Sequence, residues 1–108
     1  MTGGLPDPAA VGESARGRLD EVIHLPVRLS IVAALAATEE AEFQALRDAV
    51  QITDSALSKQ IATLEGVGYV AVRKGYVGKR PRTWLSLSAT GRQALRDHLA
   101  ALRVIAGE

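Results

Sequence analysis

The spacing of apolar residues changes once along this chain, and that change limits the folds it can adopt. Up to Leu64 the apolar residues recur three or four positions apart, as they do on one face of an α-helix. From Tyr69 the apolar segments become short and rich in β-branched or aromatic residues, which favours strands. A helical spacing returns after Ser88. The expected order is therefore a series of helices, a β-hairpin and one last helix.

Residue types at the segment ends locate the helices more closely. We expect helices at residues 16–24, 26 to about 38, 43–50, 53–66 and from residue 88 onward. Pro26 suits the first turn of a helix, where its missing N–H costs nothing. Thr53 is a good N-cap, and the charge of Asp54 complements the helix dipole. Gly66 or Gly68 can end that helix in the left-handed conformation.

The hairpin is expected from two short segments and the residues between them. Residues 69–73 and 83–87 have the composition of strands. Residues 74–82 contain two glycines and one proline, which favour a loop. The three parts together predict an antiparallel hairpin with a long basic loop at its tip.

The length of the chain fits one domain. It has 108 residues, and single domains commonly run about 100 to 150 residues. Residues 1–15 hold three glycines and two prolines without apolar periodicity, so we expect a mobile arm there. Residues 16–108 are then the folded domain.

Several kinds of site are not expected. The chain has no cysteine, and its two histidines, His24 and His98, are fewer than the three or four converging ligands of a protein zinc site. We therefore expect no metal and no cofactor. No nucleophile, base and acid occur at a recognisable spacing, and no glycine-rich phosphate loop follows a strand, so we do not expect an enzyme.

The chain is also expected to be cytoplasmic, without a membrane partner. Its longest aliphatic run, residues 31–37, is far shorter than the roughly 20 residues of a membrane span. The start of the chain lacks the positive region and apolar stretch of a secretory signal.

The net charge of +1 hides a division along the chain. Residues 1–65 hold five Lys/Arg and ten Asp/Glu, whereas residues 66–108 hold eight and two. Between Glu65 and Asp97 there is no acid at all. This asymmetry favours a polyanionic partner such as nucleic acid, and the alternative is a basic loop that is merely solvated.

A short helix, a tight turn, a further helix and a basic hairpin match the winged helix-turn-helix arrangement, whose third helix enters the DNA major groove. On a helical wheel the core residues Leu57, Ile61 and Leu64 lie opposite small polar residues and one lysine. Such a face suits a groove, although any exposed amphipathic helix would look similar. The candidate contacts of this recognition helix are Thr53, Ser55, Ala56, Ser58, Lys59, Ala62 and Thr63.

The hairpin supplies a second set of candidate contacts. Lys79, Arg80 and Arg82 lie within four residues, and Pro81 stiffens the turn between them. Cations of this kind bind phosphates or enter a minor groove. The candidate wing contacts are Arg73, Lys74, Lys79, Arg80 and Arg82.

The sequence resembles the small winged-helix transcriptional regulators related to the MarR and ArsR families, from about Leu19 to Ala106. Its most specific segments are TDSALSKQIATLE (53–65), GYV (68–70) and GKRPRT (78–83). The resemblance implies a prokaryotic, repressor-like protein that dimerises and binds a pseudo-palindromic operator. It also implies recognition-helix contacts from Ser55, Ser58, Lys59 and Thr63, and wing contacts from Lys79, Arg80 and Arg82. The chain departs from the metal sensors of the ArsR family, because it lacks their cysteines and histidine-carboxylate clusters.

Dimerisation is expected because one helix-turn-helix reads too few base pairs for genomic specificity. The last helix carries an apolar stripe that can form the interface together with the first segment, or can instead cover the core of its own monomer. The candidate interface residues are Leu19, Val22, Ile23, Leu95, Leu99, Leu102 and Ala106. A small-molecule inducer, if there is one, would bind most simply at this interface, and the sequence does not identify it.

The expected fold is thus mainly α with a small β-hairpin wing, a winged helix-turn-helix with an added C-terminal dimerisation helix. The expected function is sequence-specific DNA binding by a transcriptional regulator. The alternative is a winged-helix module that binds another protein, whose usual mark is an exposed apolar patch and not a basic wing.

Overall fold

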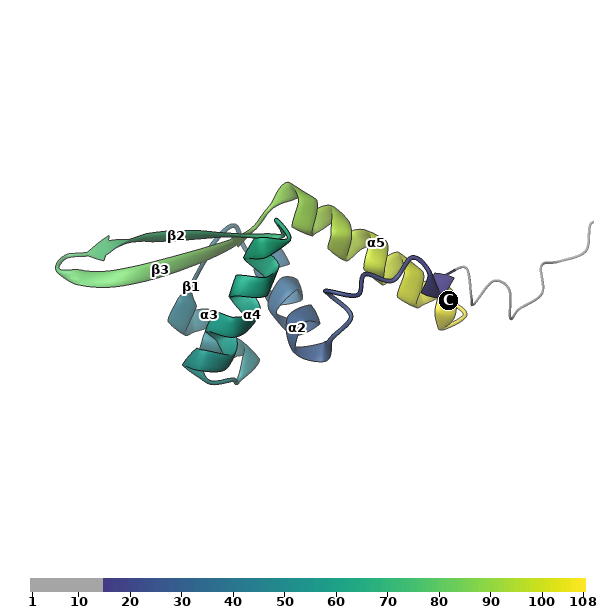
Figure 1. Cartoon of the computed structure of the whole chain (residues 1–108), viewed down its shortest axis with the longest axis horizontal. Coiled ribbons are helices and arrows are strands. Elements are labelled where there is room, and N and C mark those ends of the chain that lie inside the picture. The colour runs from purple at the N-terminus through teal and green to yellow at the C-terminus, as the bar shows by residue number, and fades with distance from the viewer. Residues whose placement is uncertain (1–14) are drawn as a thin grey trace, which may run out of the picture.

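The computed structural model describes residues 15–108, which form four helices and a small antiparallel sheet (Figure 1). The elements in chain order are α2 (Pro26–Ala36), β1 (Ala41–Glu42), α3 (Phe43–Val50), α4 (Asp54–Gly66), β2 (Val70–Val77), β3 (Arg80–Leu87) and α5 (Ala89–Ile105). This order confirms the mainly α fold with a β-hairpin wing. The arm predicted for residues 1–15 lies outside the described residues, apart from Ala15.

The helices and the sheet divide the molecule into a body and two extensions. Helices α2, α3 and α4 pack together, and the long β2–β3 hairpin and helix α5 leave this body in opposite directions (Figure 1). The sheet has the strand order β1-β3-β2, so β3 is its central strand. The hairpin is therefore anchored in the body at one end and free at the other.

The core lies where α2, α4 and the base of the sheet meet. Ile31, Leu57 and Leu85 are fully buried there. The apolar residues buried in this cluster are Ile23, Ile31, Val32, Leu35, Leu46, Leu57, Ile61, Leu64, Val70, Leu85, Leu87 and Leu95. The helical spacing of residues 57, 61 and 64 is thus confirmed as the buried face of α4.

The predicted helix starts are confirmed by their caps. Pro26 occupies the first turn of α2. The Thr53 Oγ1 atom accepts a hydrogen bond from the Ala56 N–H at 3.1 Å, which satisfies one of the free amides at the start of α4. Of the two glycines predicted to end α4, Gly66 remains helical and Gly68 takes the left-handed conformation, with φ of 81°.

The helix predicted for residues 16–24 is wrong. Only its first residue is helical, and the rest is a series of turns before α2. The Asp20 Oδ1 atom accepts hydrogen bonds from the Val22 and Ile23 amides at 2.8 and 3.1 Å. An aspartate side chain that binds the backbone two and three residues ahead competes with helix formation, and this local competition explains the difference.

The long loop predicted at residues 74–82 is also wrong, because both strands continue through it. Strands β2 and β3 pair from Val70 opposite Leu87 to Val77 opposite Arg80. Only Gly78 and Lys79 remain as the turn, with Gly78 at φ of 64°, and glycine at the first central position is typical of two-residue hairpin turns. Gly75 lies in the edge strand β2, where glycine is tolerated. Pro81 lies in β3 beyond Trp84 and Leu85, the residues that pair with β1, so β3 has β2 as its one neighbour there.

A third difference concerns the residues before α3. Ala41 and Glu42 form the short strand β1, in which Ala41 pairs with Leu85 and Glu42 with Trp84. A strand of two residues is too short to show an alternating pattern in the sequence, so its position is determined by its pairing with β3.

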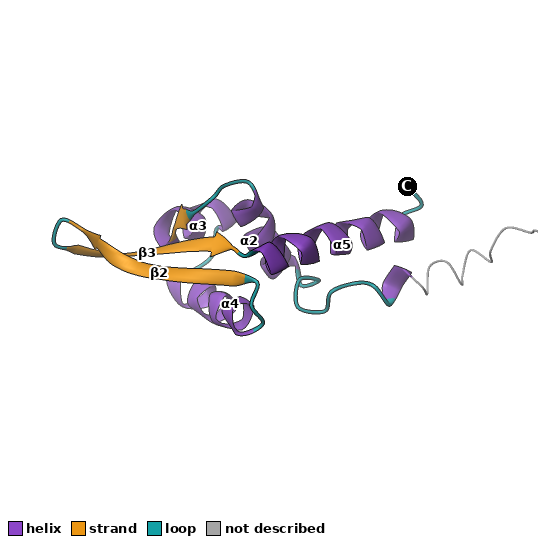
Figure 2. Cartoon of the chain, turned by 90° about the horizontal axis from the view of Figure 1, so that it is seen from above, coloured by secondary structure: helices purple, strands orange, loops and turns teal. Residues whose placement is uncertain are grey.

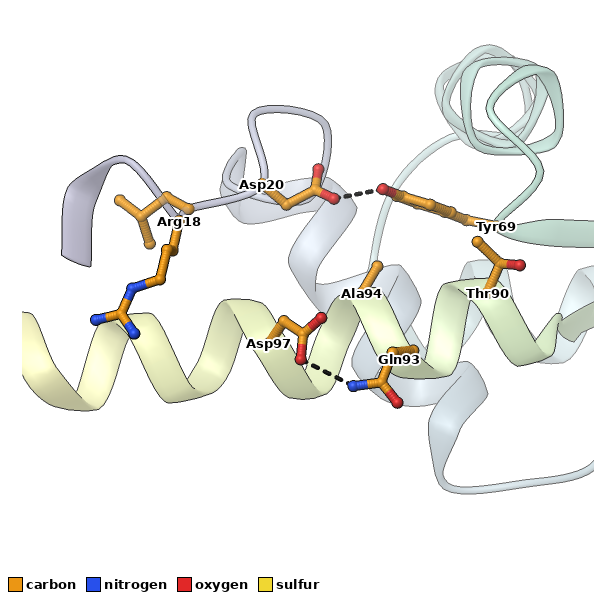
Figure 3. Close-up of a pocket in the computed structure, with 8 residues that line it drawn as sticks. Arg18, Asp20, Tyr69, Thr90, Gln93, Ala94 and Asp97 are labelled. Carbon is orange, nitrogen blue, oxygen red and sulfur yellow. Dashed lines mark hydrogen bonds between the residues drawn. The ribbon is translucent and has the colours of Figure 1, made fainter. Parts of the chain in front are cut away.

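The turns of residues 17–25 run alongside α5 (Figure 2). Asp20 joins them to α5 and to Tyr69, the residue before β2, and its bond to Tyr69 is drawn in Figure 3. The Asp20 N–H donates to Nδ1 of the fully buried His98 at 3.0 Å. The Tyr69 hydroxyl donates to the Asp20 carboxylate at 2.5 Å. This bond, followed by burial, raises the pKa of Tyr69 to about 12. The His98 ring also lies 5.3 Å from that of His24, so the histidines serve as packing and hydrogen-bonding residues here.

Within residues 15–108, no helix is long and apolar enough to cross a membrane. In the same part of the chain, no group of three histidine, aspartate or glutamate side chains is placed to hold a metal ion.

Stability should fall in mild acid because of His98. Burial, and then the charge of His24, lower the pKa of His98 from its ordinary 6.5, while Asp20 opposes them in part. His98 therefore binds a proton more readily in the unfolded chain than in the folded one. Its contribution to stability is complete above pH 6.5 and is lost as the pH falls through the lower pKa of the folded state. Urea unfolding as a function of pH should show this loss in the wild type. His98→Asn keeps an acceptor near the Asp20 N–H without titrating, so its curve should be flatter. Parallel curves would contradict this role of His98.

Candidate nucleic-acid interface

Helix α4 buries one face and presents the other to solvent. Leu57 and Leu64 are fully buried, whereas Ser55, Ser58 and Lys59 are exposed. Ala62 is exposed as well, and Ala56 and Thr63 are half-buried. The predicted contacts thus lie on the exposed or half-buried side of α4, and their contact with a ligand stays a prediction.

Two of the predicted recognition-helix hydroxyls already have partners in the free chain. Thr53 caps α4 through its Oγ1 atom, and Thr63 donates to the Lys59 carbonyl oxygen at 3.3 Å. Ser55 lies 3.5 Å from the Thr53 hydroxyl, which is the limit of a hydrogen bond. Ser58 and Lys59 are left with free side chains among the described contacts, so they are the strongest candidates for reading base edges.

An ion pair fixes how α4 follows α3. Arg47 of α3 reaches Asp54 in the first turn of α4 at 2.7 Å, and it also lies 3.1 Å from Asp48. Gln51, between the two helices, takes the left-handed conformation with φ of 57°. The turn of the helix-turn-helix is therefore held by backbone geometry and by charge.

The wing carries its cations in two different environments. At its base, Arg73 lies over the Trp84 ring, 4.1 Å from the ring centroid, and donates twice to the Glu40 carboxylate at 2.7 and 3.1 Å. Arg82 makes a second ion pair with Glu42 at 2.7 Å. The hydrogen bond from Arg73 lowers the pKa of Glu40 below its ordinary 4.5. Two of the five predicted wing contacts are therefore already paired with acids.

The other three predicted wing cations are free, and two of them, Lys79 and Arg80, lie in or beside the turn. Lys74, Lys79 and Arg80 are exposed, and no ion pair joins them to an acid within residues 15–108. Sequence reasoning missed the acids Glu40 and Glu42. Glu42 lies in the two-residue strand β1 and Glu40 directly before it, so no pattern in the sequence indicated where their carboxylates lie.

A groove connects α4 to the wing. The residues that line it come from α4, from the β2–β3 hairpin and from Phe43 at the start of α3. The lining residues are Phe43, Asp54, Ser58, Ile61, Ala62, Glu65, Val72, Lys74, Thr83 and Leu85. The predicted contacts Ser58, Ala62 and Lys74 therefore belong to one continuous surface, as a shared ligand would require.

The predicted dimer residues fall into two groups. Ile23 is fully buried and Leu95 is 7% exposed, so both belong to the core of their own chain and that part of the prediction is corrected. Leu19, Val22, Leu99 and Leu102 are half-buried, and Ala106 is exposed. The stripe on α5 thus contributes to the core at Leu95 and becomes more exposed toward the C-terminus.

Comparison with known proteins agrees with this geometry. A family model described as a winged helix DNA-binding domain matches residues 27–106. A structure of a transcriptional regulator homologue from Pyrococcus horikoshii OT3 superposes with a TM-score of 0.79 at 23% identity, covering 91% of this chain and 95% of that one.

Two further structures share the fold. A transcriptional regulator of the MarR family from Enterococcus faecalis V583 has a TM-score of 0.64 at 22% identity, with 94% of this chain and 87% of that chain covered. The regulator MOSR of M. tuberculosis, solved in complex with DNA, has a TM-score of 0.67 at 17% identity and coverages of 93% and 68%. At these identities the likeness concerns the fold.

The capping role of Thr53 can be separated from any contact with a ligand. Thr53→Ala should lower the free energy of unfolding by about 1 kcal/mol, because an amide of α4 loses its acceptor. Thr53→Ser should restore most of that loss, and Ser55→Ala, which removes an exposed hydroxyl from the same turn, should change little. Urea denaturation of the three variants measures the differences. Equal stability of Thr53→Ala and the wild type would show that the cap contributes nothing.

Proposed function

Because this chain belongs to the winged helix DNA-binding domain family, we propose that it is a transcriptional regulator that binds double-stranded DNA in a sequence-specific manner. The observation that carries this proposal is that Ser58 and Ala62 of α4 line one groove with Lys74 of the wing, while Lys59 on α4 and Lys79 and Arg80 on the wing are exposed. These residues present small polar groups where a base edge can approach and positive charge beside them, which is the chemistry a DNA groove requires.

The two parts of the surface have different roles in this proposal. Helix α4 enters the major groove, where Ser55, Ser58 and Lys59 can reach base edges. Lys74, Lys79 and Arg80 of the wing bind the phosphate backbone or an adjacent minor groove. Arg73 and Arg82 support the wing through Glu40 and Glu42 and contribute less to binding, because a phosphate would have to displace a carboxylate from each.

We further propose that residues 16–108 act as one unit of DNA binding and dimerisation. Two copies reading a pseudo-palindromic operator would place their α4 helices about 34 to 36 Å apart, and occupancy of such a site would repress transcription. The support for a dimer comes from α5, whose C-terminal half extends beyond the body of the molecule (Figure 1). There Leu99 and Leu102 remain partly exposed although they are large and apolar.

The proposal predicts two kinds of loss in DNA binding. With a fluorescent duplex from the upstream region of the gene and a shuffled control, the wild type should prefer the native duplex and weaken steeply with salt. Lys59→Ala should reduce that preference, whereas Arg80→Ala should weaken binding to both duplexes and lower the salt slope by about one. Fluorescence anisotropy at several salt concentrations measures both quantities.

Gln93→Ala, an exposed change on α5, serves as the matched control and should bind like the wild type. No binding to either duplex at low salt would overturn the proposal and favour the alternative, a winged-helix module that binds another protein. Equal losses on both duplexes for Lys59→Ala would make Lys59 a phosphate contact.

The dimer can be tested on α5 without disturbing the core. Leu102→Glu should produce a monomer in sedimentation velocity and weaken operator binding, because it places a charge in the proposed interface. Leu102 is preferred to Leu99 for this test, since Leu99 also packs against the core of its own chain. Ala100→Glu adds the same charge on the opposite, exposed side of α5 and should leave the oligomeric state unchanged. A dimer that persists in Leu102→Glu would remove this face from the interface.

A further inference from the structure

Two acids at the base of the wing hold two of its arginines. The Glu40 carboxylate accepts two hydrogen bonds from Arg73, at 2.7 and 3.1 Å. Glu42 forms an ion pair with Arg82 at 2.7 Å. Both acids come from the short segment before α3, and strand pairing places Glu42 opposite Trp84. The pairing of β1 with β3 therefore brings acids from the first half of the chain to the basic hairpin.

These ion pairs are in contact with solvent, so they contribute little to the stability of the fold. The side chain of Arg73 is 58% exposed, that of Arg82 is 24% exposed, and each carboxylate is 36% exposed. Ion pairs in contact with water commonly add little to the free energy of unfolding. The base of the wing is held instead by strand pairing and by the buried side chain of Leu85. The two acids therefore call for a role other than stability.

The alternation of side chains along the strands gives the wing two different faces. The face that borders the groove beside α4 carries Val72, Lys74, Thr83 and Leu85. The opposite face, which we call the arginine face, carries Trp84 and the three arginines Arg73, Arg80 and Arg82. A Cβ atom on Gly75 would lie 3.1 Å from the Trp84 ring, which agrees with the position of both residues on the arginine face.

Without the acids, the arginine face would be a second cationic surface on the wing. Three guanidinium groups on one ribbon attract the phosphates of any duplex, whatever its sequence. The arginine face points away from the groove beside α4. A duplex held on this face would leave the exposed side of α4 without contact, and phosphate contacts alone carry no sequence information. Such binding would compete with sequence-specific binding through α4.

We propose that Glu40 and Glu42 determine the specificity of DNA binding by neutralising the arginine face, so that a duplex binds through α4. Specificity is gained by weakening the wrong contact as well as by strengthening the right one. A phosphate that binds Arg73 must displace a carboxylate that already accepts two hydrogen bonds. The hydrogen bond from Arg73 also lowers the pKa of Glu40, which keeps this carboxylate charged at neutral pH. This inference rests on the proposed function and adds to it two residues that act on DNA binding without contacting DNA.

The charge of each acid can be removed while its size is kept. Glu40→Gln and Glu42→Gln each free one arginine, so each should bind the shuffled duplex about threefold more tightly, and the double variant about tenfold. The salt slope on the shuffled duplex should steepen by about one for each freed arginine. Affinity for the native duplex should change by less than about twofold, because the tighter site on α4 dominates there. Fluorescence anisotropy at several salt concentrations measures the fall in preference.

A neighbouring acid provides the matched control. Glu39 is exposed and makes no ion pair within residues 15–108. Glu39→Gln removes the same charge one residue away and should bind the shuffled duplex like the wild type. Arg73→Gln, added to Glu40→Gln, should return binding of the shuffled duplex to the wild-type level. A gain in Glu39→Gln equal to that in Glu40→Gln would overturn the role of the ion pairs.

Three further results would overturn the inference. Weaker binding of both duplexes by Glu40→Gln would show that the acid only holds the wing in place. An equal gain on the native and shuffled duplexes would show that the acids do not determine specificity. Either result would leave the proposed function intact. If the wild type binds no duplex at all, the proposed function fails and this inference fails with it. The variants should unfold close to the wild-type urea concentration, which shows that the change in binding is not a loss of fold.

Discussion

The register of strand β3 is the constraint on which the rest of the interface depends. Leu85 of this central strand is fully buried and pairs with Ala41 on one side and Val72 on the other. The next residue toward the tip, Trp84, pairs with Glu42 and Arg73. A slip of one residue would exchange the two faces of the strand, bury Trp84 in place of Leu85 and separate the acids from the arginines. Burial of one leucine therefore determines where the wing points relative to α4.

The division of charge along the sequence acquires a physical meaning in the folded chain. Acidic residues from the first half meet arginines from the second at the base of the wing, in the pairs Glu40–Arg73 and Glu42–Arg82. Arg92, also in the basic stretch, donates to the carbonyl oxygens of Ala36 and Thr38 after the end of α2. Unpaired cations of the described residues lie on the wing and α4, and also on α5 at Arg96 and Arg103.

The sequence was informative where local patterns decide the structure and uninformative where distant partners do. The apolar spacing of α4 and the Thr53 cap depend on neighbours within a turn or two, and both were predicted correctly. The length of the hairpin depends on pairing between strands, which overrode the glycine and proline that indicated a loop. The burial of Ile23 and Leu95, and the contact between Asp20 and His98, arise because segments nearly 80 residues apart pack together, and no local pattern encodes that. For the interface, the residue types on α4 and the wing were foreseeable, whereas the pairing of Arg73 and Arg82 required the fold.

The stacking of Arg73 on Trp84 has a consequence for observing this protein in solution. Trp84 is the single tryptophan of the chain, and it lies in the wing, under a cation held by Glu40. Intrinsic fluorescence excited at the long-wavelength edge of protein absorption therefore comes from the indole of Trp84 alone. Any event that moves Arg73 or dehydrates the hairpin changes the surroundings of that indole, while events confined to α5 leave them as they are. The molecule thus contains its own optical probe of the wing, without an added label.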